Sequence, residues 1–229
     1  MGKAAGHVTS ELFAFLSELK SNNDRTWFEA HRGRYEDFVR EPLRALIRDL
    51  DPHLEAISPH IVADDRKAGG SLFRIHRDTR FSKDKSPYKT WAAVQFRHEA
   101  GKDAHAPGFY LHLEPGNVLI GAGCWHPASD ALGKIRDAIA EDARSWFAAR
   151  DAVTGAGFEL AGDLLTRPPR GYPPDHPAIE DLKRKDFIAV RHLTEAVAMK
   201  AGFVSEYARM CADAAPLMRF LTSALDVRW

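Results

Sequence analysis

The sequence has little cysteine, no long apolar run and no excess of either charge. Cys124 and Cys211 are the only cysteines, and no Cys-x-x-Cys pair is present, which excludes a disulfide framework and a thiolate zinc site. No run approaches the roughly 18 apolar residues of a membrane-spanning helix, and residues 1–6 do not resemble a secretory signal. We therefore expect a cytoplasmic protein with no membrane partner.

The balance of charge is equally informative. The chain has 32 Lys and Arg residues against 32 Asp and Glu residues, so its overall field does not favour a polyanion. Nucleic acid, if it is bound, would have to be held by a local patch. It is the less favoured partner.

Metal and covalent chemistry have little support in the sequence. None of the 11 histidines has His-Glu-x-x-His spacing, and only His76, Asp78 and His112 suggest a ligand set. There is no Gly-x-Ser-x-Gly nucleophile turn and no Walker or dinucleotide loop. We expect no metal site, and no cofactor is evident.

The period of the apolar residues predicts the fold. Helical spacing occupies residues 9–52, where Pro42 predicts a kink or a fresh helix start. Residues 71–125 alternate with period two, which predicts strands at 72–77, 91–98, 108–114 and 118–124. Their short joins, such as Pro115-Gly116-Asn117, favour an antiparallel meander.

The remainder, residues 129–225, is mainly helical, with interruptions near Gly202 and Pro216 and one candidate strand at 187–190. No repeat or linker divides the chain. The sequence thus predicts a single compact α+β domain over residues 1–229. Its antiparallel sheet is packed against N- and C-terminal helices, and we expect the N-terminal helices to cover the apolar face.

The segment from Arg74 to Lys89 is the main candidate site. It has six cations and two carboxylates, a local excess of four positive charges in a neutral chain. Such a segment suits a phosphate or carboxylate ligand. The candidate ligand-binding residues are Arg74, Arg77, Arg80, Lys83, Lys85, Tyr88 and Lys89, and weak catalytic candidates are His76 and Asp78.

An alternative is that the same arginines form internal salt bridges that lock a surface loop. Arg77 alternates with Phe73 and Ile75, which places it on the apolar face and predicts partial burial beside a carboxylate. On that basis, Arg77→Ala should cost roughly 3–5 kcal/mol.

A secondary candidate follows the last predicted strand. Gly121 and Gly123 precede Trp125 and His126, which could form the wall of a ligand site. The glycines either allow a ligand to approach the backbone or mark a β-bulge.

Several motifs together resemble a known family. They are Asn22-Asn23-x-Arg25-x-Trp27-Phe28, Phe73-Arg74-Ile75-x-Arg77-Asp78-x-Arg80-Phe81-Ser82-Lys83-Asp84-Lys85-x-Pro87-Tyr88-Lys89, Gly121-x-Gly123-x-Trp125-x-Pro127 and Gly171-Tyr172-Pro173-x-x-His176-Pro177. The chain resembles the bacterial conserved hypothetical proteins of domain-of-unknown-function family 2461, from about Leu12 to Phe220. The resemblance implies no activity, cofactor or catalytic residue.

From the residues we expect the Arg/Lys-rich loop to bind a phosphate-bearing small molecule or a nucleotide. The alternatives are a non-catalytic module for nucleic acid or an acidic protein, and a purely structural salt-bridge cluster. Whether the protein is an enzyme is left open by the sequence.

Overall fold

The computed structural model describes residues 6–101 and 106–229, so the expectation drawn from residues 1–5 lies outside the described part. One antiparallel six-stranded sheet has the order β1-β2-β3-β4-β6-β5. The strands are β1 (Ile61–Val62), β2 (Ala92–His98), β3 (Gly108–Glu114), β4 (Asn117–Cys124), β5 (Glu159–Ala161) and β6 (Phe187–Leu193).

The helices lie before, between and after the strands in the chain. They are α1 (Ser10–Ser21), α2 (Arg25–Ala30), α3 (Arg32–Tyr35), the π-helix η1 (Glu36–Arg40), α4 (Glu41–Ile57), α5 (Ser129–Glu141), α6 (Ala143–Gly155), α7 (Ile179–Leu182), α8 (Glu195–Ala198), α9 (Phe203–Asp213) and α10 (Ala215–Ala224). In residues 6–101 and 106–229, none of them has both the length and the apolar character to cross a membrane.

The predicted α+β class and the antiparallel meander are confirmed. The runs at 91–98, 108–114 and 118–124 are strands β2, β3 and β4, paired in consecutive antiparallel order. The candidate strand at 187–190 extends to Leu193 and pairs with β4. One hydrophobic core joins residues from Val8 to Leu221, as expected for a single domain.

The predicted strand at 72–77 is wrong in its extent. Phe73 donates its N–H to Ala93 on β2, but further along Lys89 donates to Ile75 and Arg77 donates to Pro87. The segment thus divides its backbone hydrogen bonds between two partners and forms isolated bridges instead of a strand. Strands β1 and β5 were not predicted, because runs of two and three residues carry too little periodicity.

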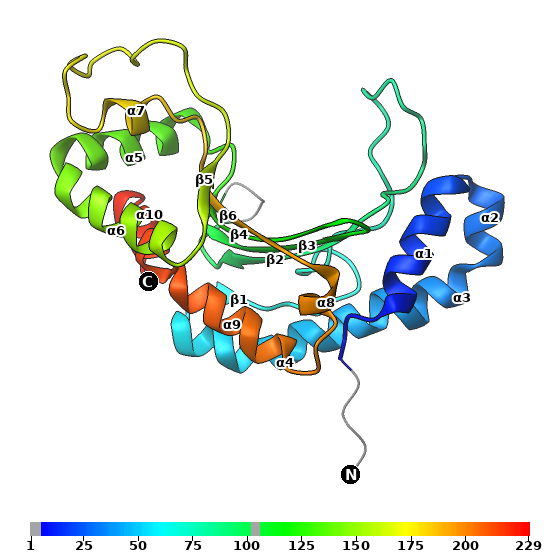
Figure 1. The fold of residues 1–229 in the computed structure, drawn as a ribbon. Helices are drawn as coiled ribbons and strands as arrows, with labels where there is room; N and C mark the ends of the chain where they lie inside the picture. The colour runs from blue at the N-terminus through cyan, green and yellow to red at the C-terminus, as the bar shows by residue number, and fades with distance from the viewer. Residues whose placement is uncertain (1–5, 102–105) are drawn as a thin grey trace.

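One face of the sheet is covered by helices from both ends of the chain. Figure 1 shows α4 and α9 running beneath the sheet and α10 at one end of it. The expectation that N-terminal helices cover the apolar face is therefore only half correct, since buried residues of α9 and α10 belong to the same core. On the opposite face, no described helix crosses the central strands, which are flanked by the loop of residues 74–90 and the segment near α7 (Figure 1).

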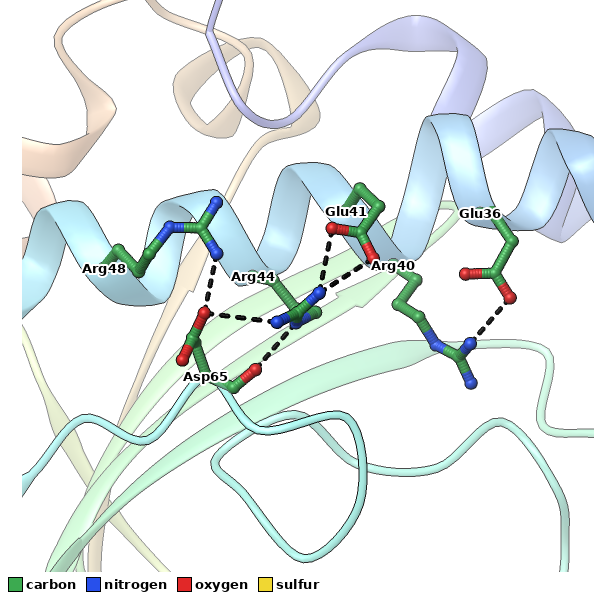
Figure 2. A network of polar contacts seen from close by, with 6 residues as sticks. All are labelled: Glu36, Arg40, Glu41, Arg44, Arg48 and Asp65. Carbon is green, nitrogen blue, oxygen red and sulfur yellow. Dashed lines mark hydrogen bonds and ion pairs between the residues drawn. The ribbon is translucent and has the colours of Figure 1, made fainter.

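Pro42 marks the predicted fresh helix start. It lies in the first turn of α4, directly after η1, where a missing backbone N–H is tolerated. Figure 2 shows how α4 is fastened to the chain that follows β1: Arg44 donates to the Asp65 carbonyl at 2.7 Å, and Arg48 reaches the Asp65 carboxylate at 2.6 Å.

The first part of the region predicted to be mainly helical contains two helices, α5 and α6, that meet at Asp142. Asp142 leaves the helical conformation and its side chain accepts the N–H of Ser145, which caps α6. Nearby, the buried Asp181 carboxylate receives three donors, from Trp146 Nε1 at 2.8 Å, Arg150 at 3.0 Å and Arg184 at 3.1 Å. This cluster joins α6 to α7.

Neither of the two asparagines before α2 caps that helix. Asp24, not Asn22 or Asn23, caps α2 by accepting the N–H of Trp27 at 2.9 Å. Asn23 instead binds the backbone of Tyr88 twice, donating to its carbonyl and accepting its N–H, both at 3.0 Å. This pair of bonds anchors the end of the Arg/Lys-rich loop to the start of α2.

Candidate functional site

The open face of the sheet contains a pocket of about 440 Å³. Its lining comes from the segments before and after the basic loop and from four strands: Phe73, Trp91, Gln95, Gly108, Tyr110, Leu119, Gly121, Ala122, Gly123, Trp125, Ile188 and Val190. A pocket of this size with mainly apolar and aromatic walls is typical of small-molecule sites.

The strand register explains why these residues meet. Gln95 lies opposite Tyr110, Tyr110 opposite Gly121, and Gly121 opposite Val190, so a single row crosses β2, β3, β4 and β6. Because alternate residues of a strand share a face, this row points away from the core. The row has a gap at Gly121, and that gap deepens the floor of the pocket.

Gly121 and Gly123 serve different purposes. A Cβ at Gly121 would meet Tyr110 Cβ at 3.6 Å, an ordinary contact, so the backbone does not require glycine there. Gly123 has φ +127°, and its Cβ would lie 2.1 Å from the Phe187 carbonyl oxygen. The pairing of β4 with β6 continues without a break through Gly123, so no bulge is present. Gly121 provides space for a ligand, whereas Gly123 allows a close approach of β6.

A hydrogen-bonded chain borders the pocket. The Tyr110 hydroxyl lies 2.9 Å from His112 Nδ1, and His112 Nε2 lies 3.4 Å from the Glu114 carboxylate. Burial, and then the charge of Glu114, raise the pKa of Tyr110 to about 12. The hydroxyl stays protonated at neutral pH. Because an ionised carboxylate only accepts, His112 Nε2–H is directed at Glu114, and Nδ1 accepts a hydrogen bond from the Tyr110 hydroxyl.

One cation of the predicted site, Lys89, lies over the aromatic rings of this pocket, and the exposed Arg74 lies near it. Lys89 Nζ is 5.2 Å from the Phe73 ring centre and 4.8 Å from that of Trp91, and it donates to the Arg74 carbonyl at 2.8 Å. Burial, and then the charge of Arg74, lower the pKa of Lys89. Neither side chain forms an ion pair with a carboxylate in the described part of the chain. Their positive charges are thus available to an anion.

Most of the remaining basic block is bound to its own carboxylates. Arg77 pairs with Asp84, and Arg80 binds both oxygens of Asp78 at 2.6–3.2 Å. Lys85 donates to the Thr79 carbonyl at 2.9 Å. These contacts match the alternative in which salt bridges lock the loop.

The predicted partial burial of Arg77 beside a carboxylate is found, but that carboxylate is exposed and not buried. The Arg77 side chain is 27% exposed and its partner Asp84 is 60% exposed. Arg77 lies beyond the residues of this segment that hydrogen-bond to β2, in the part of the chain that pairs with residues 87–89. The 3–5 kcal/mol expected for Arg77→Ala therefore falls to about 1 kcal/mol or less, as for other surface pairs.

The other residues proposed from the sequence are dispersed. Tyr88 is buried and its ring stacks on Phe28 at 4.1 Å, so the structure does not place it at the loop surface. His76 packs beside Tyr88, and Lys83 is exposed in the loop. The hydrogen bonds from Arg80 lower the pKa of Asp78 to about 2, which leaves it ionised and engaged at neutral pH.

Trp125 and His126 lie together at the end of β4, as the sequence suggested. Trp125 lines the pocket, and the His126 ring stacks on it with centres 4.1 Å apart. His126 Nδ1 is 2.7 Å from Asp186, whose side chain is only 1% exposed. Burial acts to raise the pKa of Asp186, but donors from Asp163 and His126 outweigh it and lower that pKa.

No group of three or more His, Cys, Asp or Glu side chains suited to a metal ion occurs within residues 6–101 and 106–229. In particular, His112 is engaged by Tyr110 and Glu114 instead of meeting His76 and Asp78.

Sequence reasoning missed most of the pocket wall. The sequence predicts strands at the positions of Phe73, Trp91 and Tyr110 and a candidate strand at 187–190, but it does not predict that these side chains line one pocket. The available signal was the mixed outer face of the alternating runs, where aromatic side chains stand at positions that normally face water.

The chain belongs to the family described as conserved hypothetical protein (DUF2461), whose model matches residues 11–220. This confirms the resemblance drawn from the motifs. No curated protein and no solved structure matches the sequence.

Proposed function

We propose that the protein binds a flat, anionic small molecule, such as a nucleotide, in the pocket on the open face of its sheet. The observation that carries the proposal is the pairing of a 440 Å³ aromatic pocket with Lys89 over two of its rings, with Arg74 close to that lysine. Phe73, Trp91 and Trp125 supply ring surfaces for a planar group. Lys89 and Arg74 supply the charge that a phosphate or carboxylate requires.

This proposal keeps the anion expected from the sequence but assigns it to the ends of the basic block. The middle of the block is already paired with Asp78 and Asp84, which weakens its claim on an external anion. For the same reason, a nucleic-acid or acidic-protein module has less support. We also propose a cytoplasmic location, supported by two buried cysteines that form no disulfide.

The test compares adenosine monophosphate, adenosine and inorganic phosphate as ligands, by quenching of tryptophan fluorescence and by melting temperature. Adenosine monophosphate should bind more tightly than adenosine by roughly 10- to 100-fold, because a charge-assisted hydrogen bond contributes about 1.5–3 kcal/mol. At a hundredfold excess over Kd it should stabilise the fold by about 2.7 kcal/mol. Chloride at matched ionic strength separates binding from screening.

Three variants locate the ligand. Gly121→Leu fills the floor without backbone strain and should abolish binding of both ligands while the protein stays folded. Lys89→Met should reduce the preference for the monophosphate, whereas Lys83→Met, in the same loop but exposed, should not. If no compound exceeds the effect of chloride, the small-anion proposal fails. A salt-dependent affinity for single-stranded or duplex DNA would then support the alternative module.

A further inference from the structure

The pocket has a histidine at its edge that binding alone does not use. His126 follows the pocket-lining Trp125, and the two rings are stacked with centres 4.1 Å apart. The imidazole therefore lies beside the indole that lines the pocket, and its side chain is 50% exposed.

Asp186 holds this imidazole in one orientation. The same carboxylate oxygen accepts the His126 backbone N–H at 2.8 Å and faces Nδ1 at 2.7 Å, while the other oxygen accepts the Asp163 N–H at 3.0 Å. An ionised carboxylate only accepts hydrogen bonds, so Nδ1 carries the proton. Nε2 then keeps its lone pair, and it has no hydrogen-bond partner within the described residues.

The backbone at this position is also unusual. His126 has φ +46°, a left-handed conformation that costs energy for a residue other than glycine. Such conformations gather at active sites, where the surrounding structure holds a side chain in place. Here the Asp186 hydrogen bond to the backbone N–H fixes it.

The geometry points to a catalytic role: we propose that His126 is a general base, positioned by Asp186, for hydrolysis of an ester group on the planar ligand. A buried aspartate that fixes the tautomer of a histidine is a recurring arrangement in hydrolytic sites. This inference rests on the proposed function, because the pocket must first hold the ligand.

The step balances without a further reactant. Nε2 takes a proton from a water molecule as the water oxygen forms a bond to the acyl carbon or phosphorus. The bond from that atom to the leaving oxygen breaks, and the protonated imidazole returns the proton to the leaving oxygen. One ester and one water give one acid and one alcohol.

The charged groups around the dyad are few. Asp163 contributes its N–H to Asp186, and its own carboxylate lies 4.0 Å from Lys185 Nζ. Asp186 is the charged group in direct contact with the imidazole.

The test uses p-nitrophenyl acetate and p-nitrophenyl phosphate, whose rings fit an aromatic pocket and whose product is coloured. The full chain should hydrolyse at least one of them at least tenfold faster than its His126→Asn variant, within the roughly 10²–10⁴-fold expected of a general base. Asparagine tolerates the left-handed backbone but cannot accept the proton. The control is His192→Ala, an exposed histidine on β6, which should match the unmodified chain.

Asp186→Asn tests positioning. It should lower kcat with little change in KM, since the amide no longer fixes the proton on Nδ1 but leaves the pocket that binds the ring intact. If His126→Asn loses no more activity than His192→Ala with either ester, the inference is overturned. Adenosine monophosphate binding is measured on the same His126→Asn sample. Retained binding without hydrolysis by the unmodified chain rejects the catalytic role alone, whereas absent binding rejects the proposed function.

Discussion

Alanine at Gly121 and at Gly123 should change the free energy of unfolding in opposite directions. The two positions lie two residues apart on β4, face the same pocket and are both buried. Sequence composition does not distinguish them. The difference comes only from what surrounds each Cα.

At Gly121 the added methyl group meets Tyr110 Cβ at 3.6 Å and Tyr110 Cδ1 at 3.8 Å, which are ordinary van der Waals distances. Alanine also restricts the unfolded chain more than glycine does. Gly121→Ala should therefore stabilise the protein by about 0.5–1 kcal/mol.

At Gly123 the methyl group would lie 2.1 Å from the Phe187 carbonyl oxygen and 2.9 Å from Ile188 Cα, and both atoms belong to the backbone of β6. The φ of +127° adds strain for any residue with a Cβ. Strain alone is about 1–3 kcal/mol, and β6 must also move. Gly123→Ala should thus destabilise the protein by about 2 kcal/mol or more.

Urea unfolding followed by circular dichroism measures both values in one series. In a chain of this length, 1 kcal/mol corresponds to roughly 2–4 °C in Tm, so the two variants should differ by at least about 5 °C. If the Gly123→Ala variant were as stable as the Gly121→Ala variant, β4 and β6 would not approach each other as closely as described, and the structure of the pocket floor would be wrong.

Three further substitutions probe the surroundings of the site. Asn23→Ala removes both hydrogen bonds to the Tyr88 backbone and should cost about 2–3 kcal/mol in urea unfolding; a loss below about 0.5 kcal/mol would mean that the loop is not anchored there. Asp181→Ala leaves three donors around a buried site without their carboxylate and should cost roughly 3–5 kcal/mol by the same assay, and a neutral effect would contradict the cluster. Arg80→Ala should return the pKa of Asp78 from about 2 toward 3.8 in a carboxyl ¹³C titration. Because that pKa is depressed in the folded state, the pair stabilises the fold above about pH 4 and loses its effect toward pH 2. An unchanged titration would exclude the pair in solution.

The sheet was predictable where the pattern was regular. Strands β2, β3 and β4 alternate over seven or eight residues and are joined in order, so local pattern and short connections suffice. The strand expected at 72–77 shows the limit of this reasoning. Its alternation is real, since Ile75 is buried, but a second partner at 87–89 takes over its backbone.

The pocket was not predictable, because it depends on strand order. β6 comes about 60 residues after β4 in the chain, yet it pairs with β4 and places Ile188 and Val190 beside the glycines. No local sequence pattern specifies that β6 lies between β4 and β5 in the sheet. Trp125 and His126 could be proposed as site residues from the sequence because they follow a predicted strand directly. Asp186, the partner of His126, could not be proposed because it lies 60 residues further along the chain.

The two hypotheses for residues 74–89, an anion-binding site and an internal salt-bridge cluster, are compatible in the structure. The pairs of Arg77 with Asp84 and Arg80 with Asp78 close the loop upon itself. Beyond these pairs, Lys89 returns to the start of the loop through its N–H on Ile75 and its Nζ on Arg74. That return places Lys89 over the rings of Phe73 and Trp91, which form the pocket wall. The internal salt bridges thus hold the loop in the shape that places Lys89 beside the pocket wall. The charge of Lys89, which forms no ion pair with a carboxylate in the described part of the chain, is the one that a ligand can use.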